Sequence, residues 1–291
     1  MLGYLQETVQ NWPPAAASLL LALVAGALLW VTHNRLTRFD DRQVLFADGN
    51  VAYLVQRAAL VLAFGIAALP TITRTAEDHR WYGLVGQAME LVWVFVALLL
   101  VRYLVDFVVL LRVDNTEELL KGNVALGVVE AGFYVGFGFV LNGSLTGASA
   151  TVAQGLASTV VFGLLGLVVV IGTYWLHELV TPWHLRNDIR DGKLTAAYEA
   201  AGVLAAVGIV VREGVAGDFT GWGAGLVAFS ATAIVAVATL YVFRWLTNRL
   251  ILRGLPIREI QDRDLAGASA FSAVIMVMVA VSVAAVVRTQ L

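Results

Sequence analysis

Long apolar stretches separated by short polar links constrain the fold of this chain more than any other feature. A helix needs about 20 mostly apolar residues to cross the hydrocarbon core of a bilayer. Barrel strands need only about 10, and no other structure satisfies its backbone groups in lipid. The sequence therefore predicts an all-α, polytopic membrane protein with eight spans, at roughly 14–33, 51–70, 84–111, 124–142, 155–180, 196–211, 222–247 and 267–287.

The composition agrees with this class and excludes several others. Hydrophobic residues make up 59% of the chain and charged residues 14%, whereas a soluble domain carries about 25% charged residues. The net charge of −2 offers no basic face for nucleic acid. Because there are no cysteines, disulfides, thiolate metal sites and cysteine nucleophiles are excluded. The first apolar run follows no basic segment and is long enough to span, so we expect a transmembrane helix rather than a cleaved signal peptide.

The basic residues divide unevenly between the two sets of connections. Four basic residues belong to the links after even-numbered spans or to the C-terminal end: Arg74, Arg80, Arg212 and Arg288. The links after odd-numbered spans hold twelve: Arg35, Arg38, Arg42, Arg112, Lys121, Arg186, Arg190, Lys193, Arg249, Arg253, Arg258 and Arg263. Since cytoplasmic loops carry the excess of Lys and Arg, we expect the second set inside and both termini outside.

Each even-numbered span opens with a similar stretch. The stretches are ADGNVAYLVQRAALVLAFGIA, LKGNVALGVVEAGFYVGFGFV, RDGKLTAAYEAAGVLAAVGIV and QDRDLAGASAFSAVIMVMVAV. An ungapped alignment places Gly49, Gly122, Gly192 and Arg263 together, followed by Ala59, Gly132, Gly202 and Ala273, and then by Gly65, Gly138, Gly208 and Val279. Self-similarity at a period of roughly 70 residues indicates a repeat architecture.

The repeating unit is a two-helix hairpin. The hairpins are 14–70, 84–143, 155–211 and 222–288, and they group into four-helix membrane domains at 1–145 and 146–291. Because each unit contains two spans, all copies share one orientation and any pseudo-symmetry axis lies along the membrane normal. The small residues at Gly132, Gly202, Gly138 and Gly208 favour close contacts between helices.

The segment 118–132 carries an acidic residue, leucine, Gly122-Asn123, Val-Ala and Ala-Gly in order. This pattern resembles the YjfL-like family of bacterial inner-membrane proteins (domain of unknown function 350), in two tandem copies at roughly 14–143 and 150–288. The opening motif is Gly49-Asn50 and Gly122-Asn123 in the first domain, whereas the second domain has Gly192-Lys193 and Arg263-Asp264. The resemblance implies no catalytic residues, and it implies a context of envelope stress and polyamine genes.

Ionisable residues interrupt the apolar spans, and five of them are candidates for a buried polar or ion network: Arg57, Arg102, Asp106, Glu130 and Glu199. Such groups cost roughly 2.5–3.5 kcal/mol at a helix centre, so they face protein or water and find partners. Three interpretations stay open: an interhelical clamp, a proton or ion relay or polar substrate site, and snorkelling to the interface. The last fits Asp106 and three others best: His177, Glu178 and Arg244. We expect Glu130 to face the interior with an arginine or polar group in reach, and Glu199 to match it.

Nothing in the sequence supports an enzyme, a cofactor or a metal site. No nucleophile–base pair is present, and His33, His79, His177 and His184 lack metal-ligand spacing, which predicts solvated histidines at the interfaces. The five prolines, at 13, 14, 70, 182 and 256, fall at span ends, unlike the broken helices of many transporters. This placement favours a scaffold or a simple pore over a broken-helix transporter. Together with the family resemblance it predicts a helical scaffold in envelope maintenance, with lipid, a second copy or other envelope proteins as partners. A channel or transporter for ions or small cations is the alternative, and a lipid-modifying enzyme has no motif.

Overall fold

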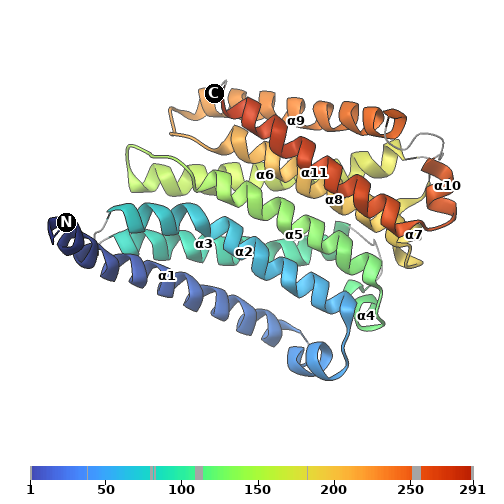
Figure 1. Ribbon diagram of the computed structural model, residues 1–291, viewed down its shortest axis with the longest axis horizontal. Helices are drawn as coiled ribbons and strands as arrows, with labels where there is room; N and C mark the ends of the chain where they lie inside the picture. The colour runs from blue at the N-terminus through green and yellow to red at the C-terminus, as the bar shows by residue number, and fades with distance from the viewer. Residues whose placement is uncertain are drawn as a thin grey trace.

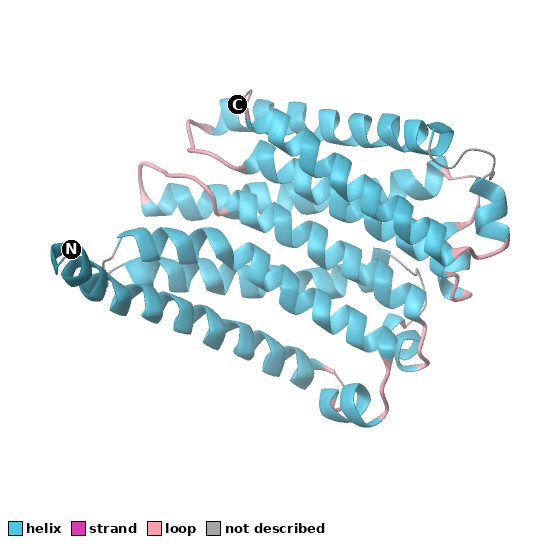
Figure 2. Cartoon of the chain, viewed as in Figure 1, coloured by secondary structure: helices cyan, strands magenta, loops and turns pink. Residues whose placement is uncertain are grey.

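The computed structural model describes residues 2–37, 39–78, 81, 83–108, 114–181, 183–250 and 257–289. Within these ranges every regular element is a helix (Figure 2). Eight helices are long and apolar enough to cross a membrane: α1 (Leu2–Leu36), α2 (Val51–Asp78), α3 (Gly83–Val108), α5 (Val124–Ser144), α6 (Val152–Val180), α8 (Leu194–Val215), α9 (Trp222–Leu250) and α11 (Ala266–Arg288). The prediction of eight spans is confirmed, although residues 109–111 of the third predicted span lie outside the described ranges.

A short helix precedes each even-numbered span at the same end of the molecule. These helices are the π-helix η1 (Gln43–Ala47), α4 (Asn115–Leu120), α7 (Leu185–Arg190) and α10 (Ile257–Asp262). They lie beside the links that carry most of the basic residues, so we call this end the basic end. Each hairpin therefore consists of a long span, a short helix and a second span.

The second spans of the four hairpins form a central row. Helix α2 packs against α5, α5 against α8, and α8 against α11, while α1, α3, α6 and α9 flank the row (Figure 1). The hairpins share one orientation, as the sequence predicts, and the extensive contacts join consecutive members. We refer to α2, α5, α8 and α11 as the central spans.

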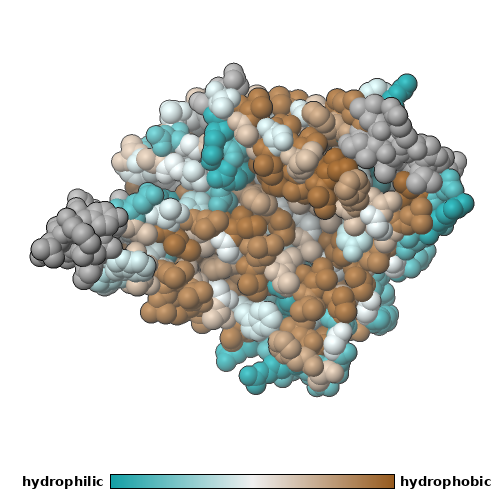
Figure 3. All heavy atoms as spheres, in the orientation of Figure 1, coloured by the Kyte–Doolittle hydropathy of each residue, from teal (hydrophilic) through white to brown (hydrophobic). Residues whose placement is uncertain are grey.

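Burial follows from position in this row. The middle spans α5 and α8 are 78% and 72% buried over their most apolar windows, whereas α1 is 17% buried. Figure 3 shows apolar side chains across the middle of one face and polar ones mainly toward its edges. A lipid environment accounts for the exposed apolar surface because hydrocarbon replaces water as the solvent.

The backbone corrects the predicted register of the fourth repeat by one residue. Gly49, Gly122 and Gly192 have φ values of 63°, 88° and 82°, and the corresponding positive φ in the fourth repeat, 45°, belongs to Asp264. The ungapped alignment placed Arg263 at this position and is wrong. It compared residue types, whereas the equivalent positions in the structure share a left-handed backbone conformation, which glycine adopts most easily.

Pro70 lies inside α2 rather than at the end of a span, so the expectation for this proline is wrong. Pro182 and Pro256 lie outside the described residues. A proline removes the N–H that would bond the carbonyl four residues earlier, which here is that of Ile66. Asn142 of α5 supplies a replacement, since its Nδ2 donates to the Ile66 carbonyl at 2.7 Å. The helix continues through the proline because a neighbouring span satisfies the freed oxygen.

Candidate functional site

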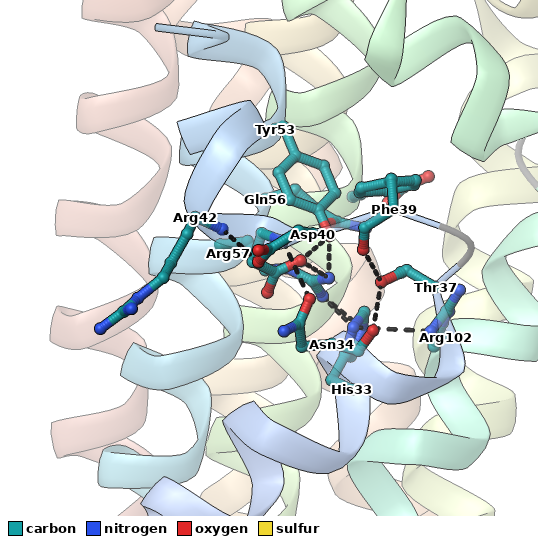
Figure 4. A network of polar contacts seen from close by, with 12 residues as sticks. His33, Asn34, Thr37, Phe39, Asp40, Arg42, Tyr53, Gln56, Arg57 and Arg102 are labelled. Atoms are coloured by element: carbon teal, nitrogen blue, oxygen red, sulfur yellow. Dashed lines mark hydrogen bonds and ion pairs between the residues drawn. The ribbon is translucent and has the colours of Figure 1, made fainter. Parts of the chain in front are cut away.

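Arg57 forms the centre of a buried polar cluster near the basic end of the first domain. Its side chain is 1% exposed, and its Nη2 donates to Asp41 Oδ1 at 2.8 Å. Its Nη1 contacts the ring of His33, and the guanidinium carbon lies 4.4 Å from the centre of the Tyr53 ring. Figure 4 shows His33 of α1 close to Tyr53 and Arg57 of α2. The buried cation is therefore paired, as its cost in lipid requires.

Asp41 is the carboxylate that completes this cluster, and sequence reasoning missed it because it lies in a link. It is 1% exposed and accepts a hydrogen bond from the Tyr53 hydroxyl at 2.6 Å. Burial raises the pKa of Asp41, and the charge of Arg57 opposes that rise. The pairing keeps the carboxylate compatible with a buried position.

Glu130 of α5 is 2% exposed and faces the protein. Its two carboxylate oxygens accept hydrogen bonds from Gln56 Nε2 at 2.7 Å and from Asn115 Nδ2 at 3.1 Å. Two carboxamides, from α2 and α4, thus hold it, and they are the polar groups that the sequence analysis named as the alternative to an arginine. Arg102 of α3 instead reaches toward His33, with Nη1 3.5 Å from Nδ1. Asp106, one turn further along α3, repels the Glu130 charge, while Arg102 attracts it.

Glu199 belongs to a separate cluster in the second domain. Its Oε2 accepts a hydrogen bond from Arg244 Nη2 at 2.8 Å, and both side chains are largely buried. Arg244 Nη1 lies 2.7 Å from Nδ1 of His177. The five candidate residues therefore divide into a first-domain group of four and Glu199, which the structure pairs with arginine rather than with amides.

The two clusters share a histidine–arginine pair that the sequence analysis did not identify. His33 and His177 are each 1% exposed, so the expectation of solvated histidines is wrong for these two. His184 is exposed, and His79 lies outside the described residues. Both buried histidines stand three residues before the end of an odd-numbered span. The arginines in question are Arg102, near His33, and Arg244, near His177, and each is followed by an aromatic residue and a leucine. A comparison of odd-numbered spans between the two domains would have found this pattern.

The asparagine of the opening motif links each of the first two repeats to the one that follows it. Asn50 Oδ1 accepts from Tyr53 N at 3.0 Å, and its Nδ2 donates to the carbonyls of Leu119 and Leu120. Asn123 repeats the arrangement: it caps α5, and its Nδ2 donates to the carbonyls of Ile189 and Arg190. One side chain thus caps its own span and the C-terminal carbonyls of the following short helix.

The second domain reaches a similar link with different residues. Lys193 holds the asparagine position of the third repeat, and its Nζ lies 2.8 Å from Asp188 Oδ1, a contact that raises the pKa of Lys193. The contact between repeats comes instead from the fourth repeat, where Asp264 Oδ1 accepts from Thr195 N at 2.9 Å and from its hydroxyl at 2.5 Å. Gln261 adds a hydrogen bond to Asp188 at 3.0 Å.

The four glycines singled out in the sequence all lie where central spans cross. A Cβ on Gly132 would stand 2.5 Å from Ala201 Cα, one on Gly202 would stand 2.6 Å from Ala273 Cβ, and one on Gly138 would stand 2.9 Å from Ala63 Cα. A Cβ on Gly208 would overlap the carbonyl of Gly136. These positions bring backbones together more closely than any side chain allows.

A second set of polar contacts crosses the central spans at the opposite end of the molecule. Arg212 of α8 donates from Nε to Asn142 Oδ1 at 2.5 Å and pairs with Glu213. Glu213 also pairs with Arg288 of α11 at 3.4 Å. Since Asn142 itself bonds the Ile66 carbonyl, this chain of contacts runs through α2, α5, α8 and α11 in turn.

The same end carries an open hollow of about 1030 Å³ between the connections that follow α5 and α8. Its charged lining is paired: Arg74 contacts Glu90 at 2.9 Å, and Asp218 accepts from the backbone of Ala148. In the described part of the chain no group of three His, Cys, Asp or Glu side chains could hold a metal ion.

Comparisons with known proteins match this architecture. The family model described as Domain of Unknown Function (DUF350) matches twice, over residues 7–145 and 151–287. A UPF0719 transmembrane protein of Aquifex aeolicus (strain VF5) is 21% identical over 206 residues, which cover 67% of this chain and 72% of that protein. No solved structure matches the chain.

Proposed function

Because the chain belongs to the DUF350 family of membrane proteins, whose description assigns no activity, we propose that it is a rigid helical scaffold that contributes to envelope maintenance. The observation that carries this proposal is that polar contacts join the four repeats at both ends of the molecule. At the basic end they run through Asn50, Asn123 and Asp264. At the other end they run from the Ile66 carbonyl to Arg288.

Glycine contacts join the same helices between these two sets of bonds. Motions that move one repeat against another, as alternating access requires, would break polar contacts at both ends and separate the backbones at Gly132 and Gly202. Helices held together in this way fit a rigid scaffold in the bilayer better than a transporter whose repeats move against one another. The partners we expect are lipid and, along the flanking helices, a second copy or other envelope proteins.

The inner membrane of a bacterium, with the basic end in the cytoplasm and both termini outside, is the location that we propose. The uneven distribution of Lys and Arg supports this orientation. In that orientation the Arg57 and Glu199 clusters lie in the cytoplasmic half, and the hollow beside Arg74 opens outside.

A channel or transporter for small cations is the second candidate. The observation that favours it is Glu130, a buried carboxylate held by two neutral carboxamides. Intramembrane carboxylates frequently mark ion and proton pathways.

Flux measurements separate the two candidates. We expect vesicles reconstituted with the purified protein to leak Na⁺, K⁺ and protons no faster than protein-free vesicles. We also expect a bacterium that lacks its own copy to become more sensitive to agents that stress the envelope. A cation flux that depends on the protein and disappears in Glu130→Gln would replace the scaffold by the transporter.

A further inference from the structure

We propose that Glu130, Gln56, Asn115 and Tyr134 bind one small monovalent cation of the size of Na⁺. This inference goes beyond the scaffold, because it concerns occupancy of a site and requires no movement of ions across the membrane. The four residues come from α2, α4 and α5 at the basic end, and all are buried, with exposed fractions of 6% or less.

Three residues next to Glu130 carry buried oxygens without a hydrogen-bond partner. Gln56 and Asn115 each contact it through the amide nitrogen, which leaves Gln56 Oε1 and Asn115 Oδ1 buried without a hydrogen-bond partner. The hydroxyl of Tyr134, one turn after Glu130 on α5, is also buried and unpartnered. Buried polar atoms ordinarily find partners, so three such oxygens on the neighbours of one carboxylate indicate a ligand site.

The charges of the first-domain cluster leave one negative charge uncompensated. Among the nearly fully buried charges, Arg57 pairs with Asp41, whereas the hydrogen-bond partners described for Glu130 are two neutral carboxamides. Arg102 and Asp106 are only half-buried, and their charges offset each other. His33 adds no charge, because both guanidinium groups face its ring and would repel an imidazolium. A single bound monovalent cation makes the cluster neutral, whereas a divalent ion would reverse its sign. Neutrality matters here because an uncompensated charge in a low-dielectric interior is costly.

The ligand chemistry fits a hard cation. Carboxylate, amide carbonyl and hydroxyl oxygens are the ligands that such ions prefer. A carboxamide presents either its nitrogen or its oxygen by turning over at the end of the side chain. Gln56 and Asn115 donate to the carboxylate in the structure, and they would turn their oxygens toward a cation held against it.

The second domain lacks such a site. Glu199, in the register position of Gln56, already pairs with the Arg244 guanidinium. Ser272 stands where the corrected register of the fourth repeat places the counterpart of Glu130. We therefore expect one cation per chain, in the first domain.

Thermal unfolding of the full-length protein in detergent tests this inference. With NaCl replacing choline chloride at constant ionic strength and pH, we expect the Tm to rise and to saturate, because a ligand that binds only the folded state stabilises it. Glu130→Gln should abolish the rise. Tyr134→Phe, which removes one ligand oxygen and leaves the ring packing intact, should shift the midpoint to several-fold higher Na⁺. Glu199→Gln is the matched control, and it should retain the full response.

Equilibrium binding of radioactive sodium provides a readout independent of unfolding, with one site per chain expected in the wild type and none in Glu130→Gln. An unchanged Tm together with no bound sodium overturns the inference, as does a response that survives in Glu130→Gln. A Tm that depends on pH but not on Na⁺ assigns the site to a proton instead. Vesicle flux is measured separately. Sodium binding without flux supports both the cation site and the scaffold, whereas sodium flux contradicts the scaffold and leaves the cation site standing.

Discussion

At the scale of single residues, Asn123 shows what a sequence pattern conveys and what it omits. The Gly-Asn dipeptide marks the start of a central span, and the glycine is explained by the positive φ of Gly122. The bonds from Asn123 to the carbonyls of Ile189 and Arg190 join positions far apart in the chain. Local patterns carry no information on such partners, so the sequence predicts the motif but not the link.

Replacing Asn123 by alanine removes a helix cap together with the two bonds to the next repeat. A lost cap costs about 1 kcal/mol, and the stranded carbonyls add about 1 kcal/mol. We expect Asn123→Ala to lower the free energy of unfolding by about 2 kcal/mol in a denaturant titration in micelles. Lys193→Ala, at the same position of the third repeat, is the control; an equal loss there would contradict the assignment.

The Glu199–Arg244 pair provides a second residue-scale prediction. Glu199→Leu leaves the Arg244 cation largely buried without its carboxylate, which should cost about 3 kcal/mol. The double variant with Arg244→Leu should regain most of that loss, because no unpaired charge remains. Additive losses in the double-mutant cycle would show that the two side chains do not interact.

At the scale of helices, apolar length predicts all eight spans, while ends and register depend on contacts that the sequence does not reveal. Helix α2 continues through Pro70 because Asn142 satisfies the Ile66 carbonyl. The fourth repeat shifts by one residue because Asp264 takes the glycine conformation. The same limit applies to the polar clusters: Glu130 and Arg57 stand out within apolar runs, whereas Asp41 and Asn115 belong to polar links, and only packing brings them to the site.

Two glycines at the same repeat position test the packing of the central spans. A Cβ on Gly138 would stand 2.9 Å from the Ala63 backbone, whereas one on Gly65 would meet nothing within 4 Å. Gly138→Ala should destabilise the protein by about 1–3 kcal/mol, the usual cost of overpacking. Gly65→Ala should be neutral or stabilising by up to about 1 kcal/mol, because alanine favours helix. Thermal unfolding compares the two, and equal effects would refute the close approach of α5 to α2.

At the scale of the whole molecule, orientation in the membrane follows from charge. The chain lacks cysteine, so single cysteines can be introduced without other changes. We expect Asp218→Cys to react with a membrane-impermeant thiol reagent in intact cells and Asp114→Cys to react only after the membrane is opened. Labelling of position 114 from outside would reverse the proposed topology.

The central claim is that the four repeats lie side by side in a row. This arrangement supports a rigid scaffold, whereas a pore would require the helices to surround a shared axis. Asp48, Lys121, Asp191 and Asp262 are exposed at the basic end, each beside the opening of a central span. Spin labels on cysteines at these positions report distances between repeats in a lipid nanodisc. We predict narrow distributions whose means increase steadily from the 48–121 pair to the 48–191 pair and the 48–262 pair. A 48–262 distance as short as that of 48–121, or a broad or double-peaked distribution, would contradict the row.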